Sequence, residues 1–243
     1  MASRIKSFFI WLFIGLLAAL IVPCILFPLA LASRSSLARR WFYKTSSWFC
    51  LCILKIVGIR LIISGPRELL QQQPAIIIMN HASSLDIPLL EALMAGAPFV
   101  WLSKVSYQKI PIGGTILQRM HVSVDRLHAS NAAKSIALFA QKAQQFQAHM
   151  LIFPEGARFT DGKLHPFKAG FALAEELTKR PVLPITVKDL HLILPKHGLL
   201  IDSSDKTIKI IIGNLLRRDS NESREAFVQR VHSTCASMLS KAI

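Results

Sequence analysis

A histidine and an aspartate lie five positions apart, just after a short apolar run of the chain. The run ends in Asn80 and His81, and Asp86 follows. Imidazole can accept a proton near neutral pH, and a carboxylate can hold its second ring nitrogen. The pair therefore predicts a general base, His81, with an orienting carboxylate, Asp86. The alternative is an ordinary helix start with His81 exposed, capped by Ser83 or Ser84 and favoured by Asp86 at the positive end of the helix dipole.

The spacing of this pair restricts the structures that can bring the two side chains together. On one continuous helix, residues five apart point about 140° away from each other, because a turn takes about 3.6 residues. Pairing therefore requires His81 in a loop and Asp86 in the first turn of the helix that follows.

A second group of residues able to do chemistry follows another apolar run. Glu155, Gly156 and Arg158 come in close succession, and Lys163 and Lys168 lie a little further along. The planar guanidinium of Arg158 can bind two oxygens of a phosphate at once. With the glycine and the lysines, it predicts a pocket for an anion. The alternative is a surface turn whose charges are solvated.

Both groups belong to motifs that can be compared with known families. The chain resembles the glycerolipid acyltransferase superfamily, specifically its bacterial 1-acylglycerol-3-phosphate acyltransferases, in the motifs Asn80-His81-x-x-x-x-Asp86 and Phe153-Pro154-Glu155-Gly156-x-Arg158. The resemblance spans about residues 65 to 215. Further blocks similar to those of the family are Lys104, Ile110–Gly114, Val124–Arg126, Pro181–Ile185 and Leu194–Lys196.

The chain departs from the family pattern at three places. Ala157 stands where the family usually has threonine, Ser106-Tyr107 replaces an acidic and aliphatic pair, and Met120-His121 stands where small residues are typical. None of these changes removes a proposed catalytic group. They leave the headgroup of the lysolipid open, so acyl transfer to another lysolipid, for example lyso-ornithine lipid, is the close alternative.

The resemblance implies an acyltransferase that makes phosphatidic acid from 1-acylglycerol 3-phosphate and an acyl thioester. It assigns His81 as the general base for the free sn-2 hydroxyl of this lysophospholipid, and Asp86 as the carboxylate that holds the ring. The hydroxyl oxygen then attacks the thioester of an acyl-CoA or an acyl carrier protein. No serine or cysteine stands at the catalytic positions, so direct transfer without an acyl-enzyme is expected.

The resemblance also implies a set of substrate-binding residues, which are Asn80, Lys104, Arg126, Glu155, Gly156 and Arg158. The last four of these would hold the phosphoglycerol end of the acceptor. A backbone amide or Lys104 would stabilise the oxyanion, and the sequence does not choose between them. We expect no metal and no cofactor besides the thioester co-substrate, because the other histidines lack the spacing of a metal site.

Short apolar runs alternate with helical periods after Gly65-Pro66, which indicates an α/β fold. The runs are mostly too continuously apolar to face water, so we expect strands that are buried on both faces. These strands are Ala75–Met79, Phe99–Leu102, Met150–Phe153, Val182–Val187 and Ile208–Ile212. Helices are expected over His128–Ala148 and Asn221–Lys241. With the resemblance, the pattern predicts an α/β fold with a mixed central sheet flanked by helices and an N-terminal hydrophobic helical anchor.

The first part of the chain has no charged residue between Phe8 and Ala32. At about 1.5 Å per residue, a helix of this length could cross a hydrocarbon core of about 30 Å. Pro23 and Pro28 would interrupt or kink it, because proline cannot donate a backbone hydrogen bond. The alternative is a cleaved signal peptide, which is disfavoured because secretory apolar regions run about 7 to 15 residues.

The next apolar stretch, Trp41–Ile63, carries three basic residues and has aromatic rings near its start. Such side chains suit the headgroup region of a bilayer, so we predict an interfacial helix. Basic residues flank both ends of the first segment, so the positive-inside rule does not orient it, and a two-helix hairpin that enters only one leaflet is the alternative to a spanning helix. We expect membrane-associated helices over residues 1–63 and an α/β acyltransferase domain over residues 64–243, at a bacterial inner membrane with the catalytic domain facing the cytoplasm.

The composition limits the class of protein. Hydrophobic residues make up 52% of the chain and charged residues 18%, which excludes a disordered chain and a charged coiled coil. A formal net charge of +15 favours anionic partners, so a non-catalytic basic membrane-binding protein is the alternative from a different class. Nucleic acid is not expected, because no stacking platform is interleaved with the basic residues. Four cysteines in apolar surroundings predict a reduced domain without a disulfide framework.

Overall fold

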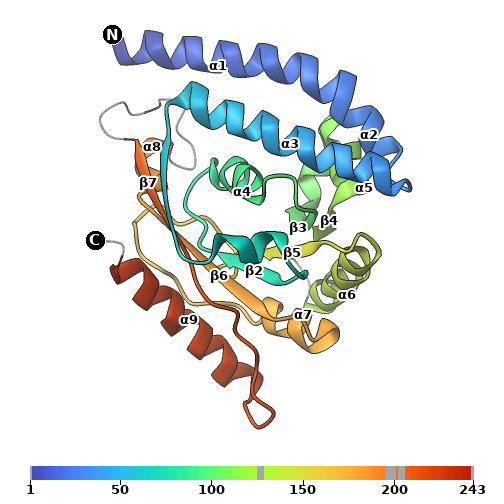
Figure 1. The fold of residues 1–243 in the computed structure, drawn as a ribbon, viewed down its shortest axis with the longest axis vertical. Helices are drawn as coiled ribbons and strands as arrows, with labels where there is room; N and C mark the ends of the chain where they lie inside the picture. Colours follow the sequence, from blue (N-terminus) through green and yellow to red (C-terminus); the bar gives the residue numbers. More distant parts are fainter. Residues whose placement is uncertain (1, 125–128, 195–200, 202–205, 242–243) are drawn as a thin grey trace.

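A seven-stranded sheet forms the centre of the part of the chain that the structure, a computed structural model, describes: residues 2–124, 129–194, 201 and 206–241 (Figure 1). The strands are β1 (Arg60–Ser64), β2 (Ile76–Met79), β3 (Phe99–Lys104), β4 (Val122–Val124), β5 (His149–Ile152), β6 (Val182–Lys188) and β7 (Thr207–Ile212). They lie in the order β1-β7-β6-β2-β5-β3-β4. β7 runs antiparallel to β6, and the other described strand pairs are parallel. The mixed sheet confirms the predicted fold class.

The three central strands consist almost entirely of buried apolar side chains. β2 and β5 are buried at every position, and β6 is buried up to Val187. Such strands form where helices cover both faces of a sheet, and α4 lies on one side of it in Figure 1 while α9 lies on the other. β2 pairs in parallel with both β5 and β6, so the carboxyl ends of these strands lie side by side. Functional groups gather at this edge of α/β sheets.

Nine α-helices are present in the described residues, and the sequence predicted some of them. They are α1 (Ala2–Ile21), α2 (Phe27–Leu31), α3 (Ser36–Val57), α4 (Asp86–Met94), α5 (Gly113–Met120), α6 (Ala129–Gln145), α7 (Gly170–Thr178), α8 (Leu190–Ile193) and α9 (Arg224–Lys241). Shorter turns are the π-helical η1 (Val22–Leu26) and the 3-10 helices η2 (Arg67–Gln71) and η3 (Val105–Lys109). α6 and α9 confirm the two helices predicted from their period.

The first apolar segment is a helix that is interrupted at its prolines. α1 gives way to η1, which contains Pro23, and α2 carries Pro28 in its first turn. Residues Arg4–Leu31 are long and apolar enough to cross a membrane. Phe8 and Phe13 are 63% and 60% exposed, so α1 presents a large apolar face without protein cover. Its length, composition and exposed face together indicate membrane association.

The helix of the second apolar stretch begins and ends earlier than predicted, at Ser36 and Val57. α3 ends at Val57, and Gly58 adopts a φ of 85° while its N–H bonds to carbonyls of the last helical turn. This left-handed cap suits glycine and stops the helix. The chain then forms β1, which pairs with β7. The helix predicted for residues 60–63 is therefore wrong, and the predicted boundary after residue 63 falls inside β1.

α3 has one buried and one exposed face. On the buried face, Ser46 and Ser47 donate hydrogen bonds to Glu91 of α4, at 2.5 Å to Oε2 and at 2.7 Å to the backbone carbonyl. The exposed face contains a stripe that repeats every three or four residues: Leu37, Trp41, Lys44, Trp48, Leu51 and Lys55. Four residues of the pattern from which an interfacial helix was predicted, Trp41, Lys44, Trp48 and Lys55, therefore lie on the exposed side of α3. Tyr43 of the same pattern is 1% exposed, and Arg60 belongs to β1. The place of α3 at a bilayer surface stays a prediction.

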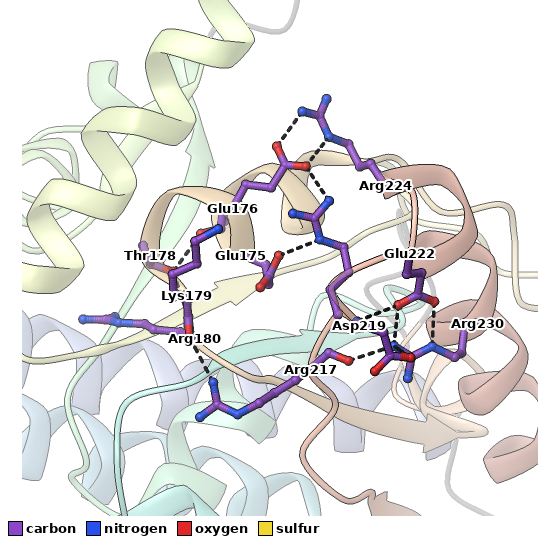
Figure 2. A network of polar contacts seen from close by, with 12 residues as sticks. Glu175, Glu176, Thr178, Lys179, Arg180, Arg217, Asp219, Glu222, Arg224 and Arg230 are labelled. Carbon is purple, nitrogen blue, oxygen red and sulfur yellow. Dashed lines mark hydrogen bonds and ion pairs between the residues drawn. The ribbon is translucent and has the colours of Figure 1, made fainter.

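An ionic network joins α7 to the segment before α9 and to α9 itself (Figure 2). Arg218 lies 3.2 Å from Glu175 and 2.8 Å from Glu176. Arg224 also bonds to Glu176, at 2.5 Å. Pairs that share a carboxylate constrain each other more than an isolated surface pair does. The network helps to hold α9, whose Leu239 lines the cavity beside the site described below.

Candidate active site

The structure brings His81 and Asp86 together in the geometry that their spacing requires. His81 lies in the loop after β2, and Asp86 is the first residue of α4. Nδ1 of His81 lies 2.5 Å from Oδ2 of Asp86. Because a carboxylate only accepts hydrogen bonds, Nδ1 donates, and the neutral ring keeps its lone pair on Nε2.

Both members of this pair are held by their surroundings. Asp86 is 1% exposed, and its Oδ2 also accepts the backbone N–H groups of Ala82 and Ser83, each at 2.9 Å. The ring of Phe153 stacks on His81 with the two centroids 4.0 Å apart. The side chain of His81 is 16% exposed. The alternative of a solvent-exposed histidine at an ordinary helix start therefore does not describe this site.

Glu155 and Asn80 join neighbouring loops and strand ends through their side chains. Oε1 of Glu155 accepts the N–H of His81 at 2.9 Å, and Oε2 accepts that of His165 at 3.2 Å. Burial raises the pKa of Glu155 above its ordinary value. Asn80 exchanges hydrogen bonds of 2.8 and 2.9 Å with the backbone of Val187. The structure thus gives both side chains positioning contacts, where the resemblance implies substrate binding.

The guanidinium of Arg158 lies against the open nitrogen of His81. Its Nε donates to Nε2 of His81 at 3.1 Å, and its Nη1 donates to Oγ of Ser84 at 3.1 Å. The residue predicted to bind phosphate and the residue predicted to act as base are therefore direct neighbours. Ser84, which the sequence indicated only as a helix cap, belongs to the same cluster.

Gly156 makes room for a lysine side chain. Its φ of 74° favours glycine, and a Cβ at this position would lie 2.9 Å from Cε and 3.0 Å from Nζ of Lys168. Any larger residue would have to displace Lys168. Gly156 therefore contributes space and a turn to the predicted anion pocket.

Two of the predicted binding residues are not placed in this cluster. Lys104 ends β3 and is exposed, and within the described ranges it makes no hydrogen bond or ion pair with the other site residues. Arg126 lies outside the residues that the structure describes. The roles that the resemblance implies for these two residues stay predictions.

A cavity of about 90 Å³ lies beside His81. Besides His81, three basic side chains line it: Lys163 from the loop after β5, Lys188 from the end of β6 and His191 from α8. The carboxylates of Glu155 and Asp189 line it as well. Lys188 and His191 were not predicted as binding residues. Lys188 could have been found, because it follows a predicted strand at the edge where functional groups gather. His191 is brought there by the turn into α8, for which the sequence has no comparable signal.

Known proteins resemble this chain in sequence. The sequence model of the acyltransferase family matches residues 60–188. A 1-acyl-sn-glycerol-3-phosphate acyltransferase of Cocos nucifera is 30% identical over 162 residues, which make up 65% of this chain and 52% of the relative. A protein of the same name from Borreliella burgdorferi is 29% identical over 153 residues, or 63% and 58% of the two chains. The chain thus spans about half the length of the curated relatives it matches.

A solved structure shares the fold over nearly the whole chain. The crystal structure of the 1-acyl-sn-glycerophosphate (LPA) acyltransferase from Thermotoga maritima matches with a TM-score of 0.79 at 20% sequence identity. The match covers 98% of this chain and 97% of that chain, and at this identity it supports the fold alone. The sequence match to the family runs from the first residue of β1 to the last of β6 and includes His81, Asp86 and Arg158, and by this match the chain belongs to the acyltransferase family.

Proposed function

We propose that this chain is a membrane-associated O-acyltransferase that makes phosphatidic acid in phospholipid biosynthesis. It moves a fatty acyl group from an acyl thioester to the free sn-2 hydroxyl of 1-acylglycerol 3-phosphate. The observation that supports this most is the His81–Asp86 pair, whose acceptor nitrogen lies beside Arg158. His81, the proposed base, thus lies next to Arg158, the side chain proposed to bind phosphate. This arrangement suits an acceptor that carries its hydroxyl and its phosphate on neighbouring carbons.

In this proposal His81 is the general base. When the hydroxyl of the lysolipid replaces Arg158 at Nε2, the ring removes its proton while the oxygen bonds to the thioester carbonyl carbon. Asp86 stabilises the imidazolium, and its hydrogen bonds to the loop keep the carboxylate in place. The proton then passes to sulfur as the C–S bond breaks, which leaves an ester and a thiol.

The transfer is proposed to be direct, without a covalent intermediate on the protein. Oγ of Ser83 donates to the carbonyl of Leu194 at 2.7 Å, and Oγ of Ser84 accepts from Arg158. Neither hydroxyl is bonded to Nε2 of His81, as a serine nucleophile would be. Holding both substrates together then supplies much of the rate enhancement.

The phosphate of the acceptor is proposed to bind Arg158, with Lys163, Lys188 and His191 around the adjoining cavity. A guanidinium binds two phosphate oxygens at once, and the lysines add positive charge. The cations Arg158, Lys163 and Lys188 outnumber the carboxylates of Glu155 and Asp189 at this cavity. This excess of positive charge supports a phosphate monoester over the headgroup of lyso-ornithine lipid, which carries an amine as well as a carboxylate.

The remaining contacts of the proposal come from the resemblance. Arg126 is a second ligand for the phosphate, and Lys104 or a backbone amide stabilises the oxyanion. The co-substrate is the thioester of CoA or of an acyl carrier protein, and we propose no metal or other cofactor. A net charge of +15 suits either donor, because both are anionic.

The proposed site of action is a bacterial inner membrane, with the catalytic domain facing the cytoplasm. The exposed apolar face of α1 supports binding to the bilayer that supplies the lysolipid. The four cysteines are all free, which suits a reducing compartment.

The proposed function is tested by acyl transfer with defined substrates. Protein purified in detergent is given lysophosphatidic acid, lyso-ornithine lipid or glycerol 3-phosphate, each with acyl-CoA and with acyl carrier protein thioester. We expect phosphatidic acid as the dominant product, identified by mass spectrometry. Preferred acylation of lyso-ornithine lipid would replace the proposed acceptor, and the absence of any transfer would favour the non-catalytic membrane-binding alternative.

A further inference from the structure

The contact between Arg158 and His81 occupies the atom on which the proposed chemistry depends. Nε2 of a neutral imidazole has a single lone pair, and Nε of Arg158 donates a hydrogen bond to it at 3.1 Å. While this bond is present, the nitrogen cannot take a proton from a hydroxyl group. Arg158 must therefore move before His81 can act as a base.

Ser84 holds the other end of the same guanidinium. Its Oγ accepts a hydrogen bond from Nη1 of Arg158 at 3.1 Å, and Ser84 itself is exposed. We call the state in which Arg158 bonds to both His81 and Ser84 the closed arrangement. The guanidinium is charged but both acceptors are neutral, so neither hydrogen bond includes an attraction between opposite charges.

A phosphate is a better ligand for Arg158 than these two neutral acceptors. With a phosphate both partners of each hydrogen bond are ionised, so opposite charges attract as well, and the guanidinium can form two such bonds side by side. Lys163 and Lys188 line the adjoining cavity and attract the same anion. When Arg158 turns to the phosphate, Nε2 becomes free for the hydroxyl of the same lysolipid molecule.

We propose that Ser84 is a positioning residue that determines specificity, because it holds Arg158 over His81 until the phosphate of the acceptor displaces it. This inference rests on the proposed function and adds a condition for the base. Hydrolysis of the donor would need a water oxygen to bond to the thioester carbonyl carbon and the water proton to move to Nε2. The C–S bond would then break as the proton passes from the imidazolium to sulfur, which leaves a fatty acid and a thiol. The closed arrangement blocks the first proton transfer, so it protects a donor that is bound without acceptor.

Supplying the hydroxyl and the phosphate of the acceptor as separate molecules tests whether phosphate is needed to free His81. The full-length protein in detergent is given acyl-CoA and 1-acylglycerol, which has the hydroxyl but no phosphate, with and without inorganic phosphate. We expect phosphate to accelerate acylation at least about tenfold, because the anion opens the closed arrangement. Potassium chloride at equal ionic strength should not. In Arg158→Ala the acceleration should be lost, since no guanidinium remains for the phosphate to move.

Removing the hydroxyl of Ser84 tests its part in the closed arrangement. Hydrolysis of acyl-CoA without acceptor is followed by release of the free thiol. We expect Ser84→Ala to raise it about three- to tenfold, the usual effect of losing one hydrogen bond, and Ser84→Thr to restore the wild-type rate. Ser233→Ala, an exposed serine of α9, is the matched control and should change nothing. The ratio of hydrolysis to phosphatidic acid formation is the deciding quantity, because partial unfolding lowers both rates together.

The outcomes separate this inference from the proposed function. One outcome overturns the inference alone: the wild type forms phosphatidic acid normally, but phosphate does not accelerate acylation of 1-acylglycerol. In the same outcome, Ser84→Ala and Arg158→Ala hydrolyse the donor at the wild-type rate. The closed arrangement then has no role in specificity. If the wild type transfers no acyl group to lysophosphatidic acid in the same assay, both proposals are overturned. Acceleration that also occurs in Arg158→Ala would show that phosphate acts elsewhere, and it too would overturn the inference.

Discussion

Each polar atom of His81 has a different partner, and only one of these partners can be exchanged. Nδ1 is bonded to Asp86, the backbone N–H to Glu155 and the backbone carbonyl to the N–H of Phe159 at 3.0 Å. Nε2 is bonded to Arg158, a long side chain at the rim of the site. A side chain held in this way keeps its orientation while Nε2, the atom that would accept the proton, exchanges one hydrogen-bond partner for another.

Replacing the base should stop the chemistry without unfolding the protein. We expect His81→Ala to lower kcat about a hundredfold or more, the usual scale for the loss of a general base. Asp86→Asn should also lower kcat, because the amide cannot stabilise the imidazolium as a carboxylate does. Steady-state rates with lysophosphatidic acid measure both effects, and circular dichroism shows whether the fold is kept. A folded His81→Ala protein with near-normal kcat would falsify the mechanism.

Replacing Arg158 should affect one substrate more than the other. Loss of a charge-assisted contact to phosphate should raise the KM for lysophosphatidic acid by about ten- to a hundredfold. Arg158→Lys should recover only part, because an ammonium lacks the planar fork. The KM for the acyl donor should change less. Kinetics with each substrate varied at a saturating level of the other check this, and a change confined to the donor would assign Arg158 to the donor site and leave Arg126 as the better phosphate ligand.

The residues of the site could be predicted where one short motif contains both partners. The spacing of His81 and Asp86 predicted a loop residue paired with a first-turn residue, and the structure has this arrangement. The contact between Arg158 and His81 joins positions 77 residues apart, so no local pattern contains it. Glu155 was expected to bind substrate, but its two oxygens accept backbone N–H groups that become neighbours only when the strands pair.

At the scale of the elements, the contact between α3 and α4 buries an ionisable side chain. Glu91 is 5% exposed and accepts a hydrogen bond from Ser46, and burial raises its pKa to about 7. Tyr43 and Cys50 of α3 face the same region, and burial raises the pKa of both groups as well. α4 also carries Asp86, so the packing of α3 against α4 helps to position the proposed catalytic pair of His81 and Asp86.

Neutralising Glu91 should change how stability depends on pH. The folded state binds the proton of Glu91 more tightly than the unfolded state, so the free energy of unfolding falls as pH rises from about 4.5 to about 7. Glu91→Gln removes this loss. At pH 8 it should be more stable than the wild type, by up to about 3 kcal/mol, and the difference should shrink toward pH 5.

Denaturant unfolding in detergent at pH 5 and pH 8 measures this difference. Glu68→Gln, an exposed carboxylate of η2, is the matched control and should leave the pH dependence unchanged. If Glu91→Gln and the wild type keep the same pH dependence, then the raised pKa does not contribute to stability.

The elements could be predicted where burial is uniform. β2, β5 and β6 were predicted because continuous apolar runs mark strands that are covered on both faces. β1 was missed because it is an edge strand that directly follows an apolar helix, and the change from one to the other occurs at Gly58 without a polar break. β4 has three residues, too few to show any period.

At the scale of the whole molecule, most of the exposed large apolar side chains of the described residues lie on the N-terminal helices, from Ile5 to Leu51. The exposed face of α1 and the aromatic and basic stripe of α3 belong to adjacent helices above α4 in Figure 1. A surface of this kind is stable in water only if it is covered, and a bilayer covers it without further protein contacts.

Polar substitutions on α1 should weaken membrane binding and leave the fold intact. Phe8, Phe13 and Leu16 are at least 60% exposed, so replacing all three by glutamine removes few contacts within the protein. Each side chain that leaves the bilayer should cost about 1.5 to 3 kcal/mol, so the three substitutions together should lower the affinity for lipid vesicles at least about a thousandfold. Flotation with vesicles measures the bound fraction. Leu138→Gln, at a 57% exposed position of α6, is the control, and equal binding by the triple variant and the control would assign the membrane contact to another surface.

The pairing of β1 with β7 has a consequence for the time at which the enzyme becomes complete. Arg60 pairs with Thr207, so the strand that follows the N-terminal helices waits for a partner made about 150 residues later, roughly 10 to 30 s at ordinary rates of synthesis. During that time α1 has already left the ribosome and can reach a bilayer, while β6, which supplies one wall of the cavity, has yet to be made. Pairing of strands so far apart in the chain is also slow, because the entropy of loop closure is lost before the stabilising contacts form. The nascent chain is therefore expected to attach to the membrane first and to complete its central sheet there, next to the bilayer that would supply the proposed lipid substrate.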